Sequence, residues 1–395
     1  MTYISLILAV LAAVAVFLLL RKGGHSAKAP QRRDAESART SANLHGLPLV
    51  SSPPLAPLPQ VEETSPAAQP ARRSIVRTVN PHVEAMLKDF EFTRSADLPR
   101  EEARAVVDML SRIPRPPSAL HKLVSPAFLA TAKTAELSEM VMAEPQIAAK
   151  VLVMVNSPFY GLRSPLGSIG QAVTFLGMNT VRSVCLQYML DESFQSKDPE
   201  VRRIFDGLWN ASAFASELCF KLAQLLQLPD PGALVTQVVL SFLGHVASHS
   251  LLPKEMVLPM IAKGMLERAR VEQRELGLSA AEIGSLLMRE WKLPAPIVES
   301  VRDIDSVLVT PCDAAQMERS TRMAFCYICA RLGERLAYGE IKDFAEYDLR
   351  QEPSVEFFHA HSYLRLPGLV RLNEFMHLPE VVKSINAMVF SMQVR

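Results

Sequence analysis

Two pairs of chemically reactive residues stand out in the sequence. His245 and His249 are four residues apart, so a helix would place both imidazoles on one face, at a spacing that can bind a metal ion. Cys326 and Cys329 form a CxxC pair within the stretch MAFCYICARL. The histidines lack the glutamate of an HExxH motif and an evident third ligand, and the cysteines have apolar, helical flanks. We therefore expect ordinary polar roles for the histidines and a buried structural role for the thiols, with metal binding as the alternative for the histidines.

Composition narrows the classes of function. The chain has 395 residues, 49% of them hydrophobic, which is enough for a substantial core. Lys and Arg total 42 against 41 for Asp and Glu. Nucleic-acid-binding proteins usually show a clear basic excess, so we expect no nucleic-acid partner. Five cysteines in a chain of this length do not form a disulfide framework.

The first residues have the pattern of a membrane anchor. Residues 3–20 are eighteen apolar or small residues without a charge, and a helix of that length spans about 27 Å. Arg21 and Lys22 follow immediately, and basic residues stay on the cytoplasmic side of a membrane. The sequence predicts a single-pass anchor over 1–22 in the inner membrane, with the N-terminus outside and the body cytoplasmic. A cleaved signal peptide is the alternative, but its positive charges would precede the apolar run.

A proline-rich linker is predicted over 23–80. Residues 21–80 contain eight prolines and no Phe, Trp or Tyr. Stretches such as SSPPLAPLPQ cannot bury enough apolar surface to offset the entropy of ordering. We expect a disordered tether between the anchor and the body.

From about residue 81 the pattern becomes helical. Ala103, Val106, Val107 and Leu110 are spaced three and four apart, and period-two alternation is nowhere sustained. The predicted body is all-α, with a helical lead-in over 81–104, a domain over 105–310 and a helical extension over 311–395 that packs on it. The expected helices are two within 128–155 and others at 168–192, 201–227, 231–250, 255–270, 279–291, 296–304, 315–338 and from 379 onward.

Five segments of the body resemble one known family. They are Ile113–Pro117 (IPRPP), 143–161 (AEPQIAAKVLVMVNSPFYG), 168–184 (SIGQAVTFLGMNTVRSV), Trp209 with Ser212, and 289–301 (REWKLPAPIVESV). Together, in this order and spacing, they are similar to the motifs of the HDOD domain, an HD-related output domain of bacterial signalling proteins. The resemblance covers roughly 105–305 and implies a helical domain related to metal-dependent HD phosphohydrolases.

The resemblance also implies that the metal ligands have been lost. HD phosphohydrolases hold divalent metal with histidines and a His-Asp pair. In this sequence the matching positions are Ala211, Gly244, His245 and Ala280, and a further pair falls on Ile304 and Asp305. A catalytic metal site needs about three protein ligands in a defined geometry. We expect no HD-type catalysis, no metal and no cofactor, and we call the four matching positions 211, 244, 245 and 280 the vestigial HD pocket.

The predicted function is regulation or signalling through another protein, which remains to be identified. The candidate interaction surface is Asn156, Ser157, Phe159 and Tyr160, with the two aromatic residues as anchors. Asn156 also suits an architectural role, because a short polar residue at a helix end caps the backbone.

The alternative is a sensor that binds a nucleotide or cyclic dinucleotide in the vestigial HD pocket. It follows from the resemblance alone, since the motif segments contain neither a glycine-rich phosphate loop nor an arginine cluster. Arg182 is one of two arginines near the motifs. A hydrolase with rearranged metal ligands is a third hypothesis.

Overall fold

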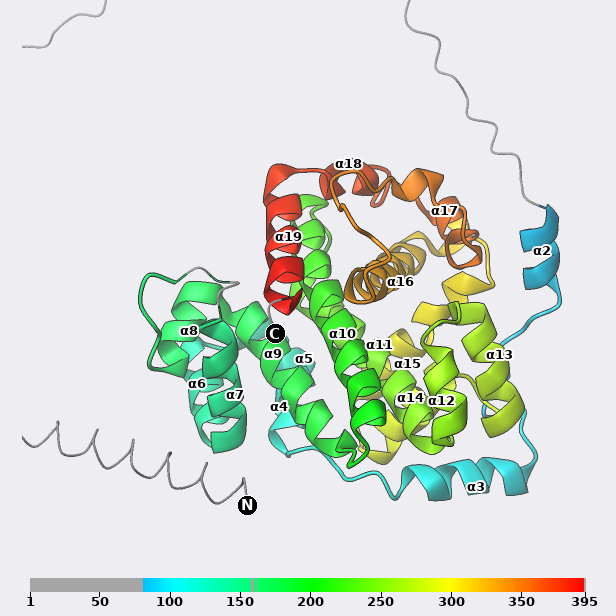
Figure 1. Cartoon of the computed structure of the whole chain (residues 1–395), viewed down its shortest axis with the longest axis horizontal. Helices are drawn as coiled ribbons and strands as arrows, with labels where there is room; N and C mark the ends of the chain where they lie inside the picture. Colours follow the sequence, from blue (N-terminus) through cyan, green and yellow to red (C-terminus); the bar gives the residue numbers. More distant parts are fainter. Residues whose placement is uncertain (1–80, 158–159, 161, 394–395) are drawn as a thin grey trace, which may run out of the picture. The chain divides into compact units, whose positions relative to one another are not determined.

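The computed structural model describes residues 81–157, 160 and 162–393. Within these residues the regular secondary structure is helical, without a β-strand, so the all-α prediction is confirmed (Figure 1). The predicted anchor at 3–20, the predicted linker at 23–80 and Phe159 lie outside the described residues.

The described chain begins with four short helices that run along the outside of the body. They are α2 (Pro81–Lys88), α3 (Arg100–Leu110), α4 (Ala119–Val124) and α5 (Pro126–Thr131). Helix α3 buries Val106 and Leu110 and packs on α14 (Ala280–Glu290). Val106 and Leu110 therefore face the core, as the sequence pattern predicts, whereas Val107 is 39% exposed.

A small lobe follows, built from helices that pack on one another (Figure 1). It consists of α6 (Thr134–Met142), α7 (Pro145–Val155), α8 (Ile169–Leu176) and α9 (Met178–Asp191). The sequence pattern predicts helix over 168–192, and within this range Gly177 adopts a φ of +84° and separates α8 from α9. Glycine takes this backbone conformation without steric cost. Helix α9 connects the lobe to the core, where it packs on α10 (Pro199–Leu225) and α11 (Pro231–Leu251).

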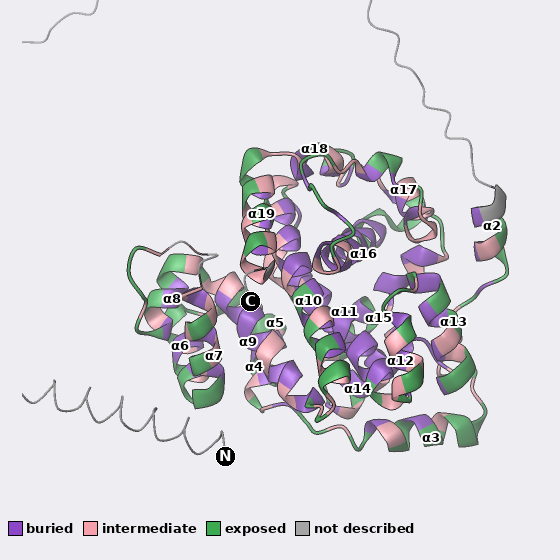
Figure 2. Ribbon diagram, in the orientation of Figure 1, coloured by how far each residue is buried: buried purple, intermediate pink, exposed green. Residues whose placement is uncertain are grey.

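Helix α11 is the centre of the core, surrounded by α10, α14 and α16 (Met317–Ala337). Every residue from Leu234 to His249 is buried (Figure 2). Among the described residues α11 is the one helix long and apolar enough to cross a membrane, and 83% of its apolar window is buried inside the body. A helix that is hydrophobic on all sides requires such surroundings, and its central position accounts for its composition.

The remaining helices complete the core and its C-terminal cover. They are α12 (Lys254–Met260), α13 (Met265–Leu276), α15 (Ala295–Arg302), α17 (Ala360–Tyr363), α18 (Leu372–Met376) and α19 (Pro379–Gln393), with 3₁₀ turns at Glu192–Phe194 (η2), Ile304–Leu308 (η3), Ala314–Gln316 (η4), Leu349–Gln351 (η5) and Val355–Phe357 (η6). The predicted helix over 255–270 is two helices, because Pro259 lies near the end of α12 and Gly264 precedes α13. Helices α16 and α19 both pack on α10.

Candidate functional site

Backbone fills the space at two positions of the vestigial HD pocket. A β-carbon on Gly244 of α11 would lie 2.2 Å from the carbonyl oxygen of Ala280, the first residue of α14. A β-carbon on Gly284 would lie 2.8 Å from the Cα of Gly244. The two helices thus approach at Gly244, and a histidine side chain fits there only if they separate.

Ala211, a third vestigial position, lies in a different helix contact. It is buried on α10, and its carbonyl oxygen would lie 2.5 Å from a β-carbon on Gly333 of α16. Ala211 therefore belongs to the close approach of α10 and α16, whereas Gly244 and Ala280 belong to that of α11 and α14.

His245, the fourth vestigial position, belongs to a group of charged and polar side chains from four elements. We call this group the buried polar cluster, and each of its residues is at most 8% exposed. Its members are His245 and His249 of α11, Arg268 and Glu272 of α13, Asp305 of η3, and Arg331 and Glu334 of α16.

The contacts within the buried polar cluster centre on one carboxylate and two guanidinium groups. Glu334 accepts hydrogen bonds from both Arg268 and Arg331. The His245 Nε2 atom lies 3.5 Å from an Arg331 nitrogen and 3.8 Å from an Asp305 carboxylate oxygen. Burial alone would raise the pKa of Glu334, but the two arginines lower the pKa below its usual range. The cluster is therefore a network in which arginine supplies the positive charge, and in which the Nε atoms of Arg268 and Arg331 have no hydrogen-bond partner among the described residues.

Burial also determines the charge of the two histidines. Burial lowers the pKa of His245 well below its usual value, and Arg331 and Arg268 lower it further. Burial, together with Arg268, lowers the pKa of His249 to about 3. Both rings are neutral at neutral pH, and both ring nitrogens of His249 have no hydrogen-bond partner among the described residues. In the part of the chain that the structure describes, no group of three or more His, Cys, Asp or Glu side chains is arranged to hold a metal ion.

The CxxC pair lies in the core, away from solvent. Cys326 and Cys329 are fully buried on α16, and Cys219 of α10 is close to both. Burial raises the pKa of Cys219, and the two neighbouring thiols raise it further. The full burial of Cys326 and Cys329 agrees with a structural role.

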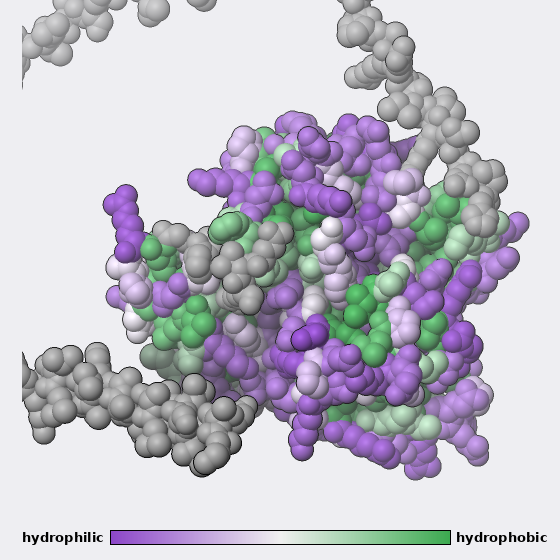
Figure 3. All heavy atoms as spheres, viewed as in Figure 1, coloured by the Kyte–Doolittle hydropathy of each residue, from purple (hydrophilic) through white to green (hydrophobic). Residues whose placement is uncertain are grey.

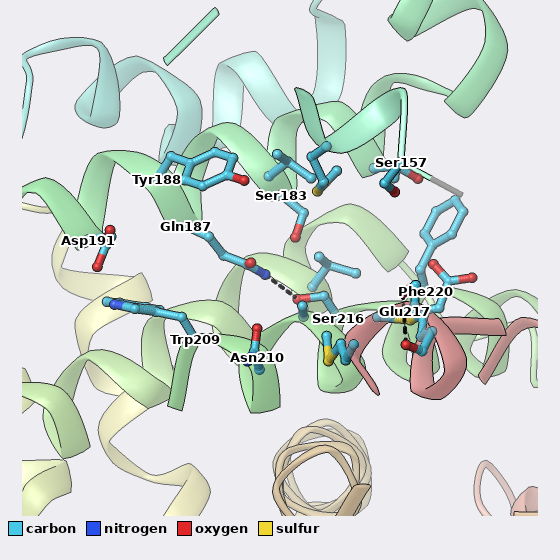
Figure 4. Close-up of a pocket in the computed structure, with 18 of the residues that line it drawn as sticks. Ser157, Ser183, Gln187, Tyr188, Asp191, Trp209, Asn210, Ser216, Glu217 and Phe220 are labelled. Atoms are coloured by element: carbon cyan, nitrogen blue, oxygen red, sulfur yellow. Dashed lines mark hydrogen bonds between the residues drawn. The ribbon is translucent and has the colours of Figure 1, made fainter. Parts of the chain in front are cut away.

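A pocket of about 420 Å³ lies between α9 and α10, and we call it the α9–α10 pocket (Figure 4). Its volume is within the range of small-molecule sites. Helix α9 lines it with Asn179, Ser183, Gln187 and Asp191, which are spaced four residues apart. Its other described lining residues are Met154, Ser157, Tyr160, Thr180, Val184, Tyr188, Arg202, Asp206, Trp209, Asn210, Ala213, Ser216, Glu217, Phe220, Val235, Met388, Ser391 and Met392.

The comparisons with known proteins identify the domain. Residues 113–307 match the family model of the HDOD domain. This chain contains an HDOD domain. An uncharacterized protein of Treponema pallidum (strain Nichols) is 21% identical over 203 residues, which is 51% of this chain and 39% of that protein. The chain thus covers about two fifths of the length of this relative.

Three solved structures are similar to this chain at low identity. An HDOD domain protein with unknown function from Geobacter sulfurreducens is 15% identical with a TM-score of 0.48, over 72% of this chain and 98% of that one. A Shewanella amazonensis protein, provisionally described as a phosphohydrolase, is 18% identical with a TM-score of 0.47, over 73% and 98% of the two chains. A Marinobacter aquaeolei protein, provisionally described as a signal transduction protein, is 18% identical with a TM-score of 0.48, over 79% and 65%.

Asn156 of the HDOD domain holds a loop in place. Its side-chain amide nitrogen donates to the carbonyl oxygens of Leu152 and Leu166, at 2.8 and 3.0 Å. Its side-chain oxygen accepts a hydrogen bond from the backbone N–H of Leu166 at 2.7 Å. Ser157 and Tyr160 line the α9–α10 pocket. The predicted interaction residues are thus divided between a loop contact and a pocket wall, and Phe159 lies outside the described residues.

Arg182 is a structural residue of the HDOD domain. Its guanidinium donates to the carbonyl oxygens of Leu123 and Gly232 and to the Thr236 hydroxyl, at 3.3, 2.6 and 2.7 Å. Burial lowers its pKa to about 10. Because these acceptors occupy the side chain, Arg182 ties α4, α9 and α11 together and is not a basic residue at the surface.

Sequence reasoning missed the α9–α10 pocket and most of the buried polar cluster. The signal for the pocket is the polar stripe from Asn179 to Asp191 at a spacing of four, within a helix that is otherwise largely apolar. The signal for the cluster is weaker. Arg331 and Glu334 lie in an apolar helical run, where charged residues are seldom buried unless they are paired.

Proposed function

We propose that this HDOD protein is a non-catalytic signalling or regulatory protein that acts by binding another protein at the cytoplasmic face of a bacterial inner membrane. The observation that carries the proposal is the contact between Gly244 and Ala280, which fills a position where the HD resemblance implies a metal ligand. In the Arg268–Glu334–Arg331 network next to it, both guanidinium groups pair with Glu334. This interior supports a scaffold role in place of phosphohydrolysis.

The same packing argues against the vestigial HD pocket as a nucleotide site. A nucleotide there requires space for a phosphate and cations that can pair with it. Arg268 and Arg331 are already paired with Glu334, and α11 and α14 are in contact at Gly244. Protein binding therefore has the better support.

The α6–α8 lobe offers a surface for the partner. It exposes three large apolar side chains, one from each helix: Met142 at 56%, Val153 at 71% and Phe175 at 56%. In the view of Figure 3, apolar residues reach the surface over this lobe. Apolar side chains left in water are favourable binding contacts, and aromatic ones often carry most of the affinity. We assign the partner surface to these three residues.

Membrane attachment is the second part of the proposal. It rests on the uncharged run at 3–20 and on the basic residues that follow, Arg21 and Lys22. A flexible linker of about sixty residues has a root-mean-square end-to-end distance of roughly 40–45 Å. It would keep the body near the membrane and so raise its effective concentration toward other membrane-associated proteins.

The test is crosslinking of the full-length protein in its own membranes. Val153→Glu and Phe175→Glu place a charge on the proposed partner surface, whereas Val370→Glu changes a valine that is 50% exposed elsewhere on the body. We expect the first two variants to lose a specific crosslinked product and the third to keep it. An unchanged product in all three variants would contradict the assigned surface. Recovery of the protein in the soluble fraction would contradict the anchor.

A hydrolysis assay tests the non-catalytic part of the proposal independently. Purified full-length protein is incubated with Mn²⁺ and either a nitrophenyl phosphodiester or a cyclic dinucleotide. We expect no turnover above background. Turnover that is lost in His245→Ala, with the fold retained, would overturn the non-catalytic proposal.

A further inference from the structure

The α9–α10 pocket carries an excess of negative charge. Its described lining includes three carboxylates, Asp191, Asp206 and Glu217, and a single cation, Arg202. Arg202 already contacts Asp191 at 2.9 Å and Asp206 at 2.6 Å, so it is committed to two of the carboxylates. The lining therefore has a net charge of −2, which disfavours an anion and attracts a cation.

The third carboxylate lies where α10 meets the C-terminal helix. Glu217 accepts a hydrogen bond from the Ser384 hydroxyl of α19 at 2.6 Å, and Lys221 lies 3.4 Å from it. Burial raises the pKa of Tyr160, and the negative charge of Glu217 raises it further. Glu217 therefore contributes negative charge at this end of the pocket, and Lys221 offsets part of it.

Four buried polar atoms of the lining have no hydrogen-bond partner among the described residues, and two of them belong to the ion pair of Arg202 and Asp191. The other two are the Nε1–H of Trp209, a residue that is 8% exposed, and the hydroxyl of Ser183, a residue that is 6% exposed. Figure 4 shows the Ser183 oxygen pointing from α9 toward the space above α10. A buried indole N–H without an acceptor costs free energy, and an oxygen atom on a ligand would satisfy it.

The walls of the pocket suit a ligand whose main part is apolar or aromatic. Trp209 and Phe220 belong to α10 and Tyr188 to α9. Met388 and Met392 of α19 line the same space. Aromatic faces attract cations, and methionine side chains adapt to the shape of a ligand.

We propose that the α9–α10 pocket is a binding site for a small organic cation, an amine that carries a hydroxyl or carbonyl oxygen on an apolar or aromatic body. The ammonium group is held by the carboxylates, the oxygen accepts from Trp209, and the body lies between the aromatic side chains and α19. The site goes beyond the proposed protein interaction and shares no residue with the Met142, Val153 and Phe175 surface. Either proposal therefore stands if the other fails.

Trp209 provides a direct readout on the full-length protein. The chain has two tryptophans, and the other one, Trp291, is 2% exposed and does not line the pocket. Phenylethanolamine is the probe, because it combines an ammonium, a hydroxyl and a phenyl group. Phenylethanediol replaces the ammonium by a neutral hydroxyl, and mandelate replaces the aminomethyl group by a carboxylate. Choline tests a cation without an aromatic ring.

We expect phenylethanolamine to change the tryptophan emission saturably. The diol should bind at least ~10-fold more weakly, since one lost charge interaction is worth about 1.4 kcal/mol, and mandelate should not bind. Trp209→Phe should abolish the signal. Asp206→Asn, at the lining carboxylate within one turn of Trp209, should weaken binding ~5–10-fold, whereas Glu290→Gln, at an exposed carboxylate outside the pocket, should leave it unchanged. Ala213→Phe fills the pocket from a half-buried position of α10 and should abolish binding, as measured by calorimetry.

Several results would overturn the proposal. The first is that the diol or mandelate binds as tightly as phenylethanolamine or more tightly. The second is that Ala213→Phe leaves binding unaffected while the melting curve of the protein is unchanged. The third is that neither phenylethanolamine nor choline gives a saturable response up to ~10 mM. The last ligand to be tested is acetyl-lysine methylamide, which mimics a lysine side chain of a protein. If it binds more tightly than both small cations, the occupant is a side chain of another protein and the small-molecule assignment is wrong.

Discussion

The carboxylate of Glu272 accepts a hydrogen bond from the backbone N–H of Ala280 at 2.8 Å. Its other oxygen accepts from the Ser248 hydroxyl, also at 2.8 Å. One buried side chain of α13 therefore joins the beginning of α14 to α11, at a position where the HD resemblance implies a metal ligand. This arrangement makes the interior of the domain sensitive to pH.

We predict that Glu272 makes the protein less stable as pH rises toward neutrality. Burial raises the pKa of Glu272 to about 7, in spite of the hydrogen bonds from Ala280 and Ser248. A carboxyl group whose pKa is higher in the folded than in the unfolded protein stabilises the fold at low pH, and this contribution is lost as pH rises through the folded pKa. Relative to Glu272→Gln, the wild-type free energy of unfolding should fall by about 3 kcal/mol between about pH 4.5 and 7.

The comparison with Glu272→Gln isolates this carboxyl from its neighbours. Burial also raises the pKa of Asp305, to about 6, whereas the lowered pKa values of His245 and His249 act in the opposite direction. These contributions cancel in the difference between the two proteins. Urea denaturation at several pH values measures the difference in the free energy of unfolding between the two proteins. If the free energies of both proteins change with pH in parallel, the pKa of Glu272 is not raised.

Glu334 is predicted to be essential for stability because it neutralises two buried arginines. Glu334→Gln leaves Arg268 and Arg331 buried with less compensating charge, and removal of one member of a buried ion pair costs about 3–5 kcal/mol. Denaturant unfolding at neutral pH measures the loss. Glu290→Gln, in an exposed pair with Arg115, should change stability by less than about 1 kcal/mol. Equal effects of the two substitutions would mean that the buried network contributes little.

Gly244 is predicted to tolerate no side chain. A β-carbon there would lie 2.2 Å from the Ala280 carbonyl oxygen, so Gly244→Ala should cost about 1–3 kcal/mol and Gly244→His more. Gly264→Ala is the matched control, because its β-carbon would lie 3.5 Å from a Glu356 carboxylate oxygen, in ordinary contact. Thermal unfolding separates the variants. A Gly244→His protein as stable as wild type would show that the vestigial HD pocket can open.

Local sequence patterns predicted most of the helices but few of the contacts among them. The expected helix over 231–250 is α11, Pro231–Leu251, because Pro231 marks its start and its apolar composition persists to the end. The break between α12 and α13, near Gly264, was not predicted. Apolar residues continue at helical spacing through this segment, and only Pro259 and one glycine signal the break. Helix boundaries depend on such local signals, which a sequence displays directly.

The site depends on contacts between distant segments, which single-sequence patterns do not display. Arg268 and Glu334 are 66 residues apart, and their pairing follows only from the way α13 and α16 pack. Gly244 was recognised as a lost ligand, yet its contact with Ala280 needs the positions of two helices. The polar stripe on α9 was visible, but its meaning depends on α10 and α19.

Asn156 is predicted to act through the loop that it holds. Asn156→Ala removes three hydrogen bonds, to Leu152 and to both backbone groups of Leu166, and should cost about 1–3 kcal/mol. Asn156→Asp replaces the amide donor by a carboxylate oxygen that faces the carbonyl oxygens of Leu152 and Leu166, so it should be at least as destabilising as Asn156→Ala. Hydrogen exchange at residues 162–168 should quicken in both variants. If Asn156→Ala instead keeps full stability and slow exchange but loses the crosslinked partner, Asn156 contacts that partner directly and the architectural role is wrong.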